Sequence, residues 1–172
     1  MANRFVLNET SYHGAGAIQN IPEEIKGRGF QKVFLASDPD LIKFGVTKKV
    51  TDLLDKAGIA YEIFSEIKPN PTIENVQHGV EAFKKMGADC IVAIGGGSPI
   101  DAAKAMWIKY EYPDCTFEDM CKVFGLPKLR RKAHFCAISS TSGTATEVTA
   151  FSIITDYQKL SLIHISEPTR LR

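Results

Sequence analysis

A buried strand that runs directly into a glycine turn and a helix start constrains the fold of this chain most. Residues 91–94 form a short, continuous apolar run, which is typical of a parallel strand covered on both faces. The three glycines at 95–97 allow a sharp turn and leave no Cβ between the backbone and a ligand. We therefore predict a phosphate-binding turn, in preference to a plain strand-to-helix connection.

The residues after the glycines predict how the helix begins. Ser98 suits the N-cap, and Pro99 suits the first helical position. Asp101 falls where the acid of a capping box would lie. The free N–H groups and the positive end of the helix dipole would then face whatever lies over the glycines.

Strand and helix patterns alternate along the rest of the chain. Further strands are predicted at 32–37, 60–64, 134–138 and 148–155. Helices are predicted near 22–26 and at 46–57, 73–86 and 99–109. Gly58 would end the second of these helices, and Thr72 and Gly87 would cap and end the third. A short strand or hairpin is predicted from Arg4–Leu7 to Gly16. The repeated strand–helix–strand order predicts an α/β fold, with a mostly parallel sheet and helices on both faces.

Two polar segments follow predicted strands and so fall at the carboxyl edge of the sheet, where such folds bind ligands. Asp38 follows the strand at 32–37, and its carboxylate suits a ribose diol and would repel a 2′-phosphate. Because Asp38-Pro39-Asp40 is also good turn chemistry, a helix or turn cap is an equal alternative. The hydroxyl-rich segment Ser139–Glu147 suits phosphate or a nicotinamide amide, with an ordinary serine-rich loop as the alternative.

Composition excludes several classes of protein. The 172 residues have room for one sizeable domain, and a formal net charge of +1 gives no electrostatic case for nucleic acid or an anionic membrane. No apolar run approaches the ~20 residues of a transmembrane helix, and the N-terminus lacks the apolar core of a secretory signal. The four cysteines show no C-x-x-C spacing, which predicts reduced, mostly structural thiols in a cytoplasmic protein.

Four segments together resemble a known family. They are Asp38, Pro69–Thr72, Gly95–Asp101 and Ser140–Thr144. In this order they look like the cofactor domain of the iron-containing (group III) alcohol dehydrogenases, in the branch of lactaldehyde reductases and butanol or propanediol dehydrogenases. The resemblance covers residues 1 to about 159. It implies the Rossmann-like N-terminal domain of the dehydroquinate synthase-like fold, without the helical second domain.

The resemblance implies how the glycine turn would bind NAD. Gly96, Gly97 and Ser98 would hold the pyrophosphate. Asp101 would lie nearby at the helix start. This turn differs from a G-x-G-x-x-G fingerprint, because there the acidic residue follows the glycines by ~20 residues, whereas here Asp38 precedes them.

The resemblance also implies the rest of the NAD site. Asp38 would contact the adenosine ribose and favour NAD over NADP, and Asn70 would lie on the adenosine side. The cofactor between adenine and nicotinamide would be lined by Ser140, Thr141 and Thr144. Ile153 would lie near the nicotinamide.

In the family, bound Fe²⁺ polarises the carbonyl of a small aldehyde while the nicotinamide C4 delivers hydride. The resemblance therefore implies NAD, iron, a small alcohol or aldehyde substrate, and a homodimer or larger assembly. The family's iron ligands are one aspartate and three histidines of the second domain. The histidines here form no Asp-x-x-x-His pair and lie on unrelated predicted elements: His13, His78, His134 and His164. We predict no metal ligand and no catalytic residue in this chain.

The end of the chain departs from the family pattern. After Lys159 the family would continue with a basic stretch that includes a cofactor-binding lysine, whereas residues 160–172 look similar to translated sequencing-adapter read-through. We therefore expect an NAD-binding domain at 1–159, inactive alone, and a non-native tail at 160–172. The alternatives are a stand-alone nucleotide-binding module without catalysis and a zinc-dependent relative such as glycerol dehydrogenase.

Overall fold

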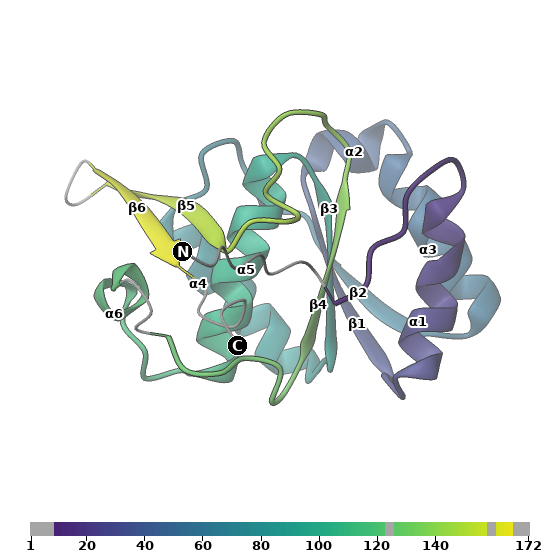
Figure 1. Ribbon diagram of the computed structural model, residues 1–172, viewed down its shortest axis with the longest axis horizontal. Helices are drawn as coiled ribbons and strands as arrows, with labels where there is room; N and C mark the ends of the chain where they lie inside the picture. Colours follow the sequence, from purple (N-terminus) through teal and green to yellow (C-terminus); the bar gives the residue numbers. More distant parts are fainter. Residues whose placement is uncertain (1–8, 123–125, 158–160, 167–172) are drawn as a thin grey trace, which may run out of the picture.

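Four parallel strands form the central sheet, in the spatial order β2–β1–β3–β4 (Figure 1). The computed structural model describes residues 9–122, 126–157 and 161–166. The strands of this sheet are β1 (Lys32–Ser37), β2 (Ala60–Phe64), β3 (Cys90–Gly95) and β4 (His134–Ser139). All four were predicted within one residue at each end. Of the strand or hairpin predicted from Arg4–Leu7 to Gly16, residues 4–8 lie outside the described residues, and the described residues 9–16 contain no strand.

Helices cover both faces of the sheet (Figure 1). They are α1 (Ile21–Gly27), α2 (Pro39–Lys43), α3 (Val46–Ala57), α4 (Ile73–Met86), α5 (Gly97–Glu111) and α6 (Phe117–Cys121), with a 3₁₀ turn η1 at Ala17–Asn20. As predicted, Thr72 caps α4, since its hydroxyl accepts a hydrogen bond from the N–H of Asn75 at 3.2 Å. Gly58 and Gly87 follow the ends of α3 and α4, also as predicted.

Alternate residues of each strand face opposite helical layers. On β1, Phe34 and Ala36 pack in the core cluster that α4 and α5 complete. Val33 and Leu35 pack in the cluster of α1 and α3. This period of two within continuous apolar strands confirms the predicted three-layer α/β fold. Its two cores fix the sheet, and with it the loops at the sheet's carboxyl edge.

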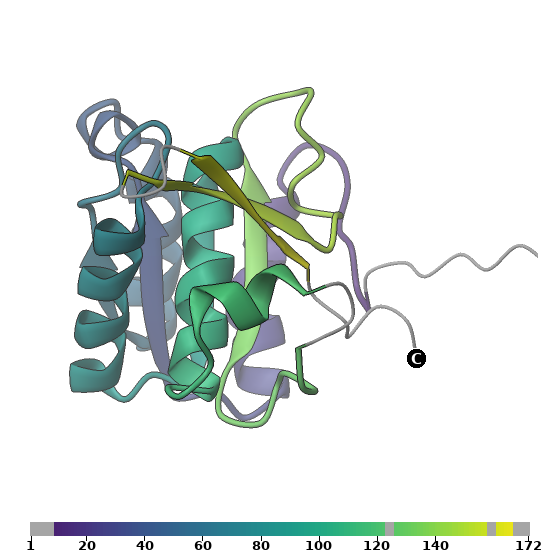
Figure 2. The same cartoon turned by 90° about the vertical axis from the view of Figure 1, so that its left-hand side faces the viewer.

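A small antiparallel hairpin lies against α5, outside the main sheet (Figure 2). It consists of β5 (Phe151–Asp156) and β6 (Ser161–Ser166). β5 begins three residues later than predicted, because the N–H groups of Val148 and Thr149 bond to the carbonyl of Ala145 and form a turn there. β6 lies within the predicted tail, residues 160–172, and pairs with β5 through backbone groups. The domain boundary at 159 stays a prediction.

Within the described ranges, no helix is long and apolar enough to cross a membrane.

Candidate functional site

The carboxyl ends of β1, β3 and β4 meet at one edge of the sheet. Ser37 lies opposite Ile94, and Gly95 lies opposite Ser139, so the loops after these strands begin at the same level. The chain runs from β1 outward to β2 and returns to β3 on the other side of β1. The strand order therefore changes direction between β1 and β3. Open α/β sheets bind ligands outside the carboxyl ends at such a switch.

The glycine turn leads into α5 two residues earlier than predicted. Gly95 ends β3 with φ of 154°, which reverses the chain at once, and Gly96 takes the N-cap position. Ser98 was predicted as the N-cap, and this is wrong: it lies in the first helical turn. Because Gly96 has no side chain, the N-cap supplies no oxygen to the first N–H groups of the helix. That arrangement suits an anion.

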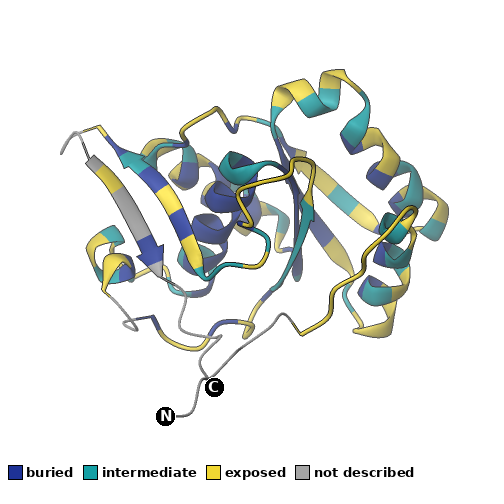
Figure 3. Ribbon diagram, turned by 45° about the horizontal axis from the view of Figure 1, so that its top comes forward, coloured by how far each residue is buried: buried dark blue, intermediate teal, exposed yellow. Residues whose placement is uncertain are grey.

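The hydroxyl-rich loop after β4 packs directly against the glycine turn. A Cβ added to Gly96 would lie 3.1 Å from Oγ1 of Thr141, and one added to Gly97 would lie 3.3 Å from Cγ2 of Thr144. Both distances are shorter than an ordinary van der Waals contact. The side chains of Ser140, Thr141 and Thr144 are exposed, and the loop lies at the surface (Figure 3). The structure thus brings together two predicted segments of the site.

Asp38 lies at the same edge, directly after β1. It is the N-cap of α2, and its Oδ1 accepts a hydrogen bond from the N–H of Leu41 at 2.8 Å. Of the two alternatives for Asp38, a ribose contact and a helix or turn cap, the structure therefore shows the helix cap. That bond uses one carboxylate oxygen, and the side chain is only half-buried. Capping is thus compatible with a second contact to a ligand.

Asn70 and Ile153 belong to a second group of site residues, around the hairpin. Asn70 is exposed and has φ of 54°. The carbonyl of the next residue, Pro71, accepts a hydrogen bond from the N–H of Thr155 on β5 at 2.8 Å. Ile153 lies on β5 and is 43% exposed. The backbone bond from Thr155 to Pro71 thus connects the loop that carries Asn70 to the strand that carries Ile153.

Asp101 is buried on the side of α5 that faces β5, with 7% exposure. Its predicted capping-box position is wrong, because the early helix start makes Pro99 the third helical residue. Burial raises the pKa of Asp101 to about 6, against the opposing effects of the Ile153 N–H and the charge of Lys104. Oδ1 of Asp101 has no hydrogen-bond partner among the described residues. Lys104, which sequence reasoning missed, lies one turn further along and is 4% exposed.

Replacing Asp101 should change how stability depends on pH. Because folding raises the pKa of this carboxyl from 3.8 to about 6, its contribution to stability is full at low pH and is lost as the pH rises through 6. Asp101→Asn removes this loss. The free energy of unfolding of the variant, relative to wild type, should rise by about 2 kcal/mol between pH 4 and pH 7. Urea denaturation at both pH values measures this change, and a difference between variant and wild type that does not vary with pH would contradict the raised pKa of Asp101.

Replacing Gly95 should destabilise the chain. A Cβ there would lie 2.5 Å from Cγ of Pro99, a rigid ring held in α5, and φ of 154° is rarely adopted by other residues. Gly95→Ala should therefore lower the free energy of unfolding by about 2–5 kcal/mol. Gly143→Ala is the matched control, since Gly143 has φ of 132° but open space around its Cβ position. Equal losses in thermal denaturation would rule out the clash with Pro99.

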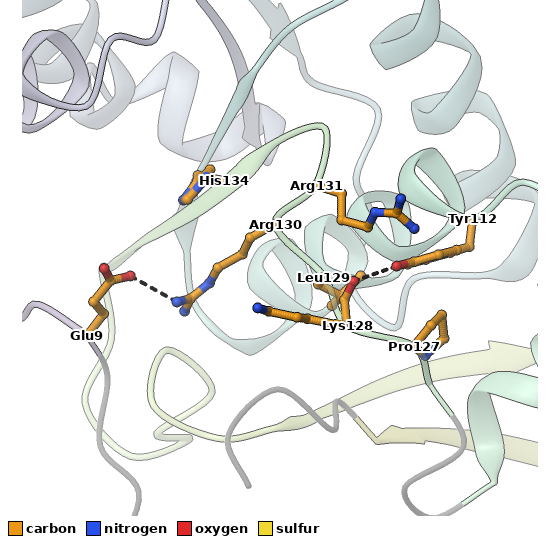
Figure 4. Close-up of a pocket in the computed structure, with 8 residues that line it drawn as sticks. All are labelled: Glu9, Tyr112, Pro127, Lys128, Leu129, Arg130, Arg131 and His134. Atoms are coloured by element: carbon orange, nitrogen blue, oxygen red, sulfur yellow. Dashed lines mark hydrogen bonds and ion pairs between the residues drawn. The ribbon is translucent and has the colours of Figure 1, made fainter. Parts of the chain in front are cut away.

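A pocket lies at the opposite, amino edge of the sheet, before β4 (Figure 4). It is lined by Glu9, Tyr112, Pro127, Lys128, Leu129, Arg130, Arg131 and His134. Nη1 of Arg130 donates to Oε2 of Glu9 at 2.9 Å. The pocket contains none of the predicted site residues, so its basic side chains form a separate surface.

Metal ligands do not gather in the part of the chain that the structure describes. No three His, Cys, Asp or Glu side chains there are placed to hold a metal ion.

Comparison with known proteins agrees with this architecture. The sequence profile of the iron-containing alcohol dehydrogenases matches residues 8–171. The chain is 46% identical to the NADPH-dependent butanol dehydrogenase of Clostridium saccharobutylicum, over 90% of this chain and 39% of that protein. It is 44% identical to the lactaldehyde reductase of Escherichia coli (strain K12), over 92% of this chain and 41% of that protein.

A solved structure of a 1,3-propanediol oxidoreductase is similar in fold. It superposes with a TM-score of 0.90 at 28% sequence identity, over 99% of this chain and 44% of that one. The chain thus spans about two fifths of the length of these relatives. By profile, identity and fold, the chain belongs to the iron-containing alcohol dehydrogenase family.

Proposed function

We propose that the carboxyl edge of this sheet binds NAD(H). The chain would form the cofactor-binding part of an enzyme that transfers hydride between the nicotinamide and a small alcohol or aldehyde. The observation that carries the proposal is the convergence of the glycine turn, the start of α5 and the hydroxyl-rich loop at the strand switch. The names of the two relatives, a butanol dehydrogenase and a lactaldehyde reductase, support the substrate class.

The pyrophosphate would bind at the start of α5. Gly96, Gly97 and Ser98 present backbone N–H groups there, at the positive end of a 15-residue helix. The two glycines carry no Cβ, so that a phosphate can approach the backbone closely. Asp101 would lie near the pyrophosphate, close to the helix start, with its buried carboxyl facing β5.

The adenosine would lie on the β1 side of the turn. The half-buried Asp38 would accept hydrogen bonds from the ribose diol and repel a 2′-phosphate. Asn70 would lie beside the adenosine. Since one relative is named as NADPH-dependent, family membership alone does not determine whether the chain binds NAD or NADP. The preference for NAD rests on the Asp38 carboxylate.

The nicotinamide half would extend along the hydroxyl-rich loop towards the hairpin. The exposed side chains proposed to line it are Ser140, Thr141 and Thr144. Ile153 would supply an apolar surface near the nicotinamide ring. When bound, NAD(H) supplies or accepts the hydride. These residues bind and orient it, and none of them is assigned a catalytic role.

We also propose a cytoplasmic protein that forms a homodimer or larger assembly. The four cysteines show no C-x-x-C spacing, which suits a reducing compartment. The residues from 160 to 172 would be foreign to the native protein. Resequencing the gene past the codon for Lys159 tests this: we expect a continuation with an Asp-x-x-x-His pair. Reading Leu160–Arg172 again would contradict the foreign origin.

Titration of the chain with NADH, followed by the cofactor's fluorescence, tests the proposed function. We expect saturable binding that NAD⁺ and ADP-ribose displace, because the pyrophosphate and adenosine contacts come from the described residues. NADPH should bind more weakly. An absence of NADH binding by a folded chain would overturn the proposal.

A further inference from the structure

A buried lysine anchors the segment that connects the hydroxyl-rich loop to β5. Nζ of Lys104 on α5 donates hydrogen bonds to three backbone carbonyls: those of Thr146 at 2.5 Å, Thr149 at 2.9 Å and Phe151 at 2.9 Å. The lysine is 4% exposed. An ammonium group has three N–H donors, and it is buried at this depth only when acceptors compensate for the lost water. Lys104 therefore holds this segment in one position.

The anchored segment is continuous with the loop over the glycine turn. Thr146 follows two residues after Thr144, and its N–H bonds to Oγ1 of Thr144 at 3.5 Å. Thr144 in turn packs against Gly97, the first residue of α5. One helix thus carries both the proposed phosphate-binding N–H groups and, two turns further along, the anchor of the loop that faces them.

A neighbouring contact fixes the strand rather than the loop. Oγ of Ser152 donates a hydrogen bond to the carbonyl of Asp101 at 2.7 Å, so β5 is tied to α5 independently of Lys104. Loss of the lysine should therefore release the loop while the hairpin stays attached.

We propose that Lys104 is a positioning residue for cofactor binding: it sets the distance between the hydroxyl-rich loop and the glycine turn. This inference rests on the proposed NAD(H) site. Because its Nζ bonds to the backbone carbonyls of Thr146, Thr149 and Phe151, we expect Lys104 to act on the cofactor through Thr144 and its neighbours.

The test compares two lysines of the same helix. Lys104→Met keeps an unbranched apolar side chain but removes the donors. Lys109→Met is the matched control, because Nζ of Lys109 bonds to the carbonyls of Pro113 and Cys115, both at 2.7 Å, at the other end of α5. The NADH dissociation constant should rise at least about tenfold in Lys104→Met and stay unchanged in Lys109→Met.

Hydrogen exchange of the unliganded chain gives a second readout that needs no cofactor. The amides of Val148 and Thr149, which bond to Ala145 within the anchored segment, should exchange faster in Lys104→Met and at the wild-type rate in Lys109→Met. Should Lys104→Met fail to fold, Lys104→Gln, which keeps two N–H donors, replaces it in both measurements with the same expected direction.

The outcomes separate the inference from the proposed function. If wild type binds no NADH, the proposed function fails, and the exchange rates still decide whether Lys104 holds the loop. If wild type binds NADH and a folded Lys104 variant binds it equally well, the positioning role is overturned. Unchanged exchange at Val148 and Thr149 overturns it as well.

Discussion

Gly97→Val should abolish NADH binding without unfolding the chain. A Cβ at this position already meets Cγ2 of Thr144 at 3.3 Å, and the added methyl groups would also cover the first N–H groups of α5. We expect the NADH dissociation constant to rise at least about 100-fold, equivalent to roughly 2.7 kcal/mol. Fluorescence titration measures the loss, and circular dichroism checks that the sheet is intact.

A graded series and a matched control make this result specific. Gly97→Ala adds the Cβ alone and should weaken binding less. Gly27→Val places the same side chain at the end of α1, where nothing lies within 4 Å of the Cβ position, and should leave NADH binding unchanged. A folded Gly97→Val chain that binds NADH like wild type would return the glycine turn to a purely structural role.

Asp38→Asn should change which cofactor the chain prefers. The asparagine can still cap α2 at Leu41 but no longer repels a 2′-phosphate. We expect NADPH to bind at least about tenfold more tightly than to wild type. NADH affinity should change little, because an amide oxygen still accepts a hydrogen bond from the ribose.

Asp38→Ala separates the ribose contact from the charge. It removes the acceptor as well, so NADH binding should weaken by about tenfold, and loss of the cap should cost about 1 kcal/mol of stability. Asp40→Ala is a nearby control, since Asp40 is exposed within α2 and caps nothing there. Unchanged affinities for both cofactors in both Asp38 variants would leave this residue with its capping role alone.

The sheet and most helices could be predicted because local signals agree with the packing. Continuous apolar runs marked β1 and β3, which are buried on both faces. Apolar spacing together with Thr72 and two C-terminal glycines bounded α3 and α4. The glycine turn and the hydroxyl-rich loop were also expected at one edge, because carboxyl ends of neighbouring parallel strands coincide.

What sequence reasoning missed depends on contacts between distant segments. Ser98 looks like a good N-cap, yet the turn at Gly95 starts the helix at Gly97. Asp101 resembles a capping acid, but its burial against β5 follows from where the hairpin packs. Lys104 has the pattern of an ordinary helix lysine, because its neighbours along the chain do not indicate that two carbonyls of a later loop and one of β5 surround it.

The most direct measurement of the central claim is hydrogen exchange of the chain with and without saturating NADH. We predict slower exchange in three segments: the glycine turn and first turn of α5, the residues around Asp38, and the loop 140–146. The basic pocket around Arg130 at the opposite edge is an internal control, because its cations would attract phosphate through charge alone. Protection there, with none at the carboxyl edge, would contradict the proposed site.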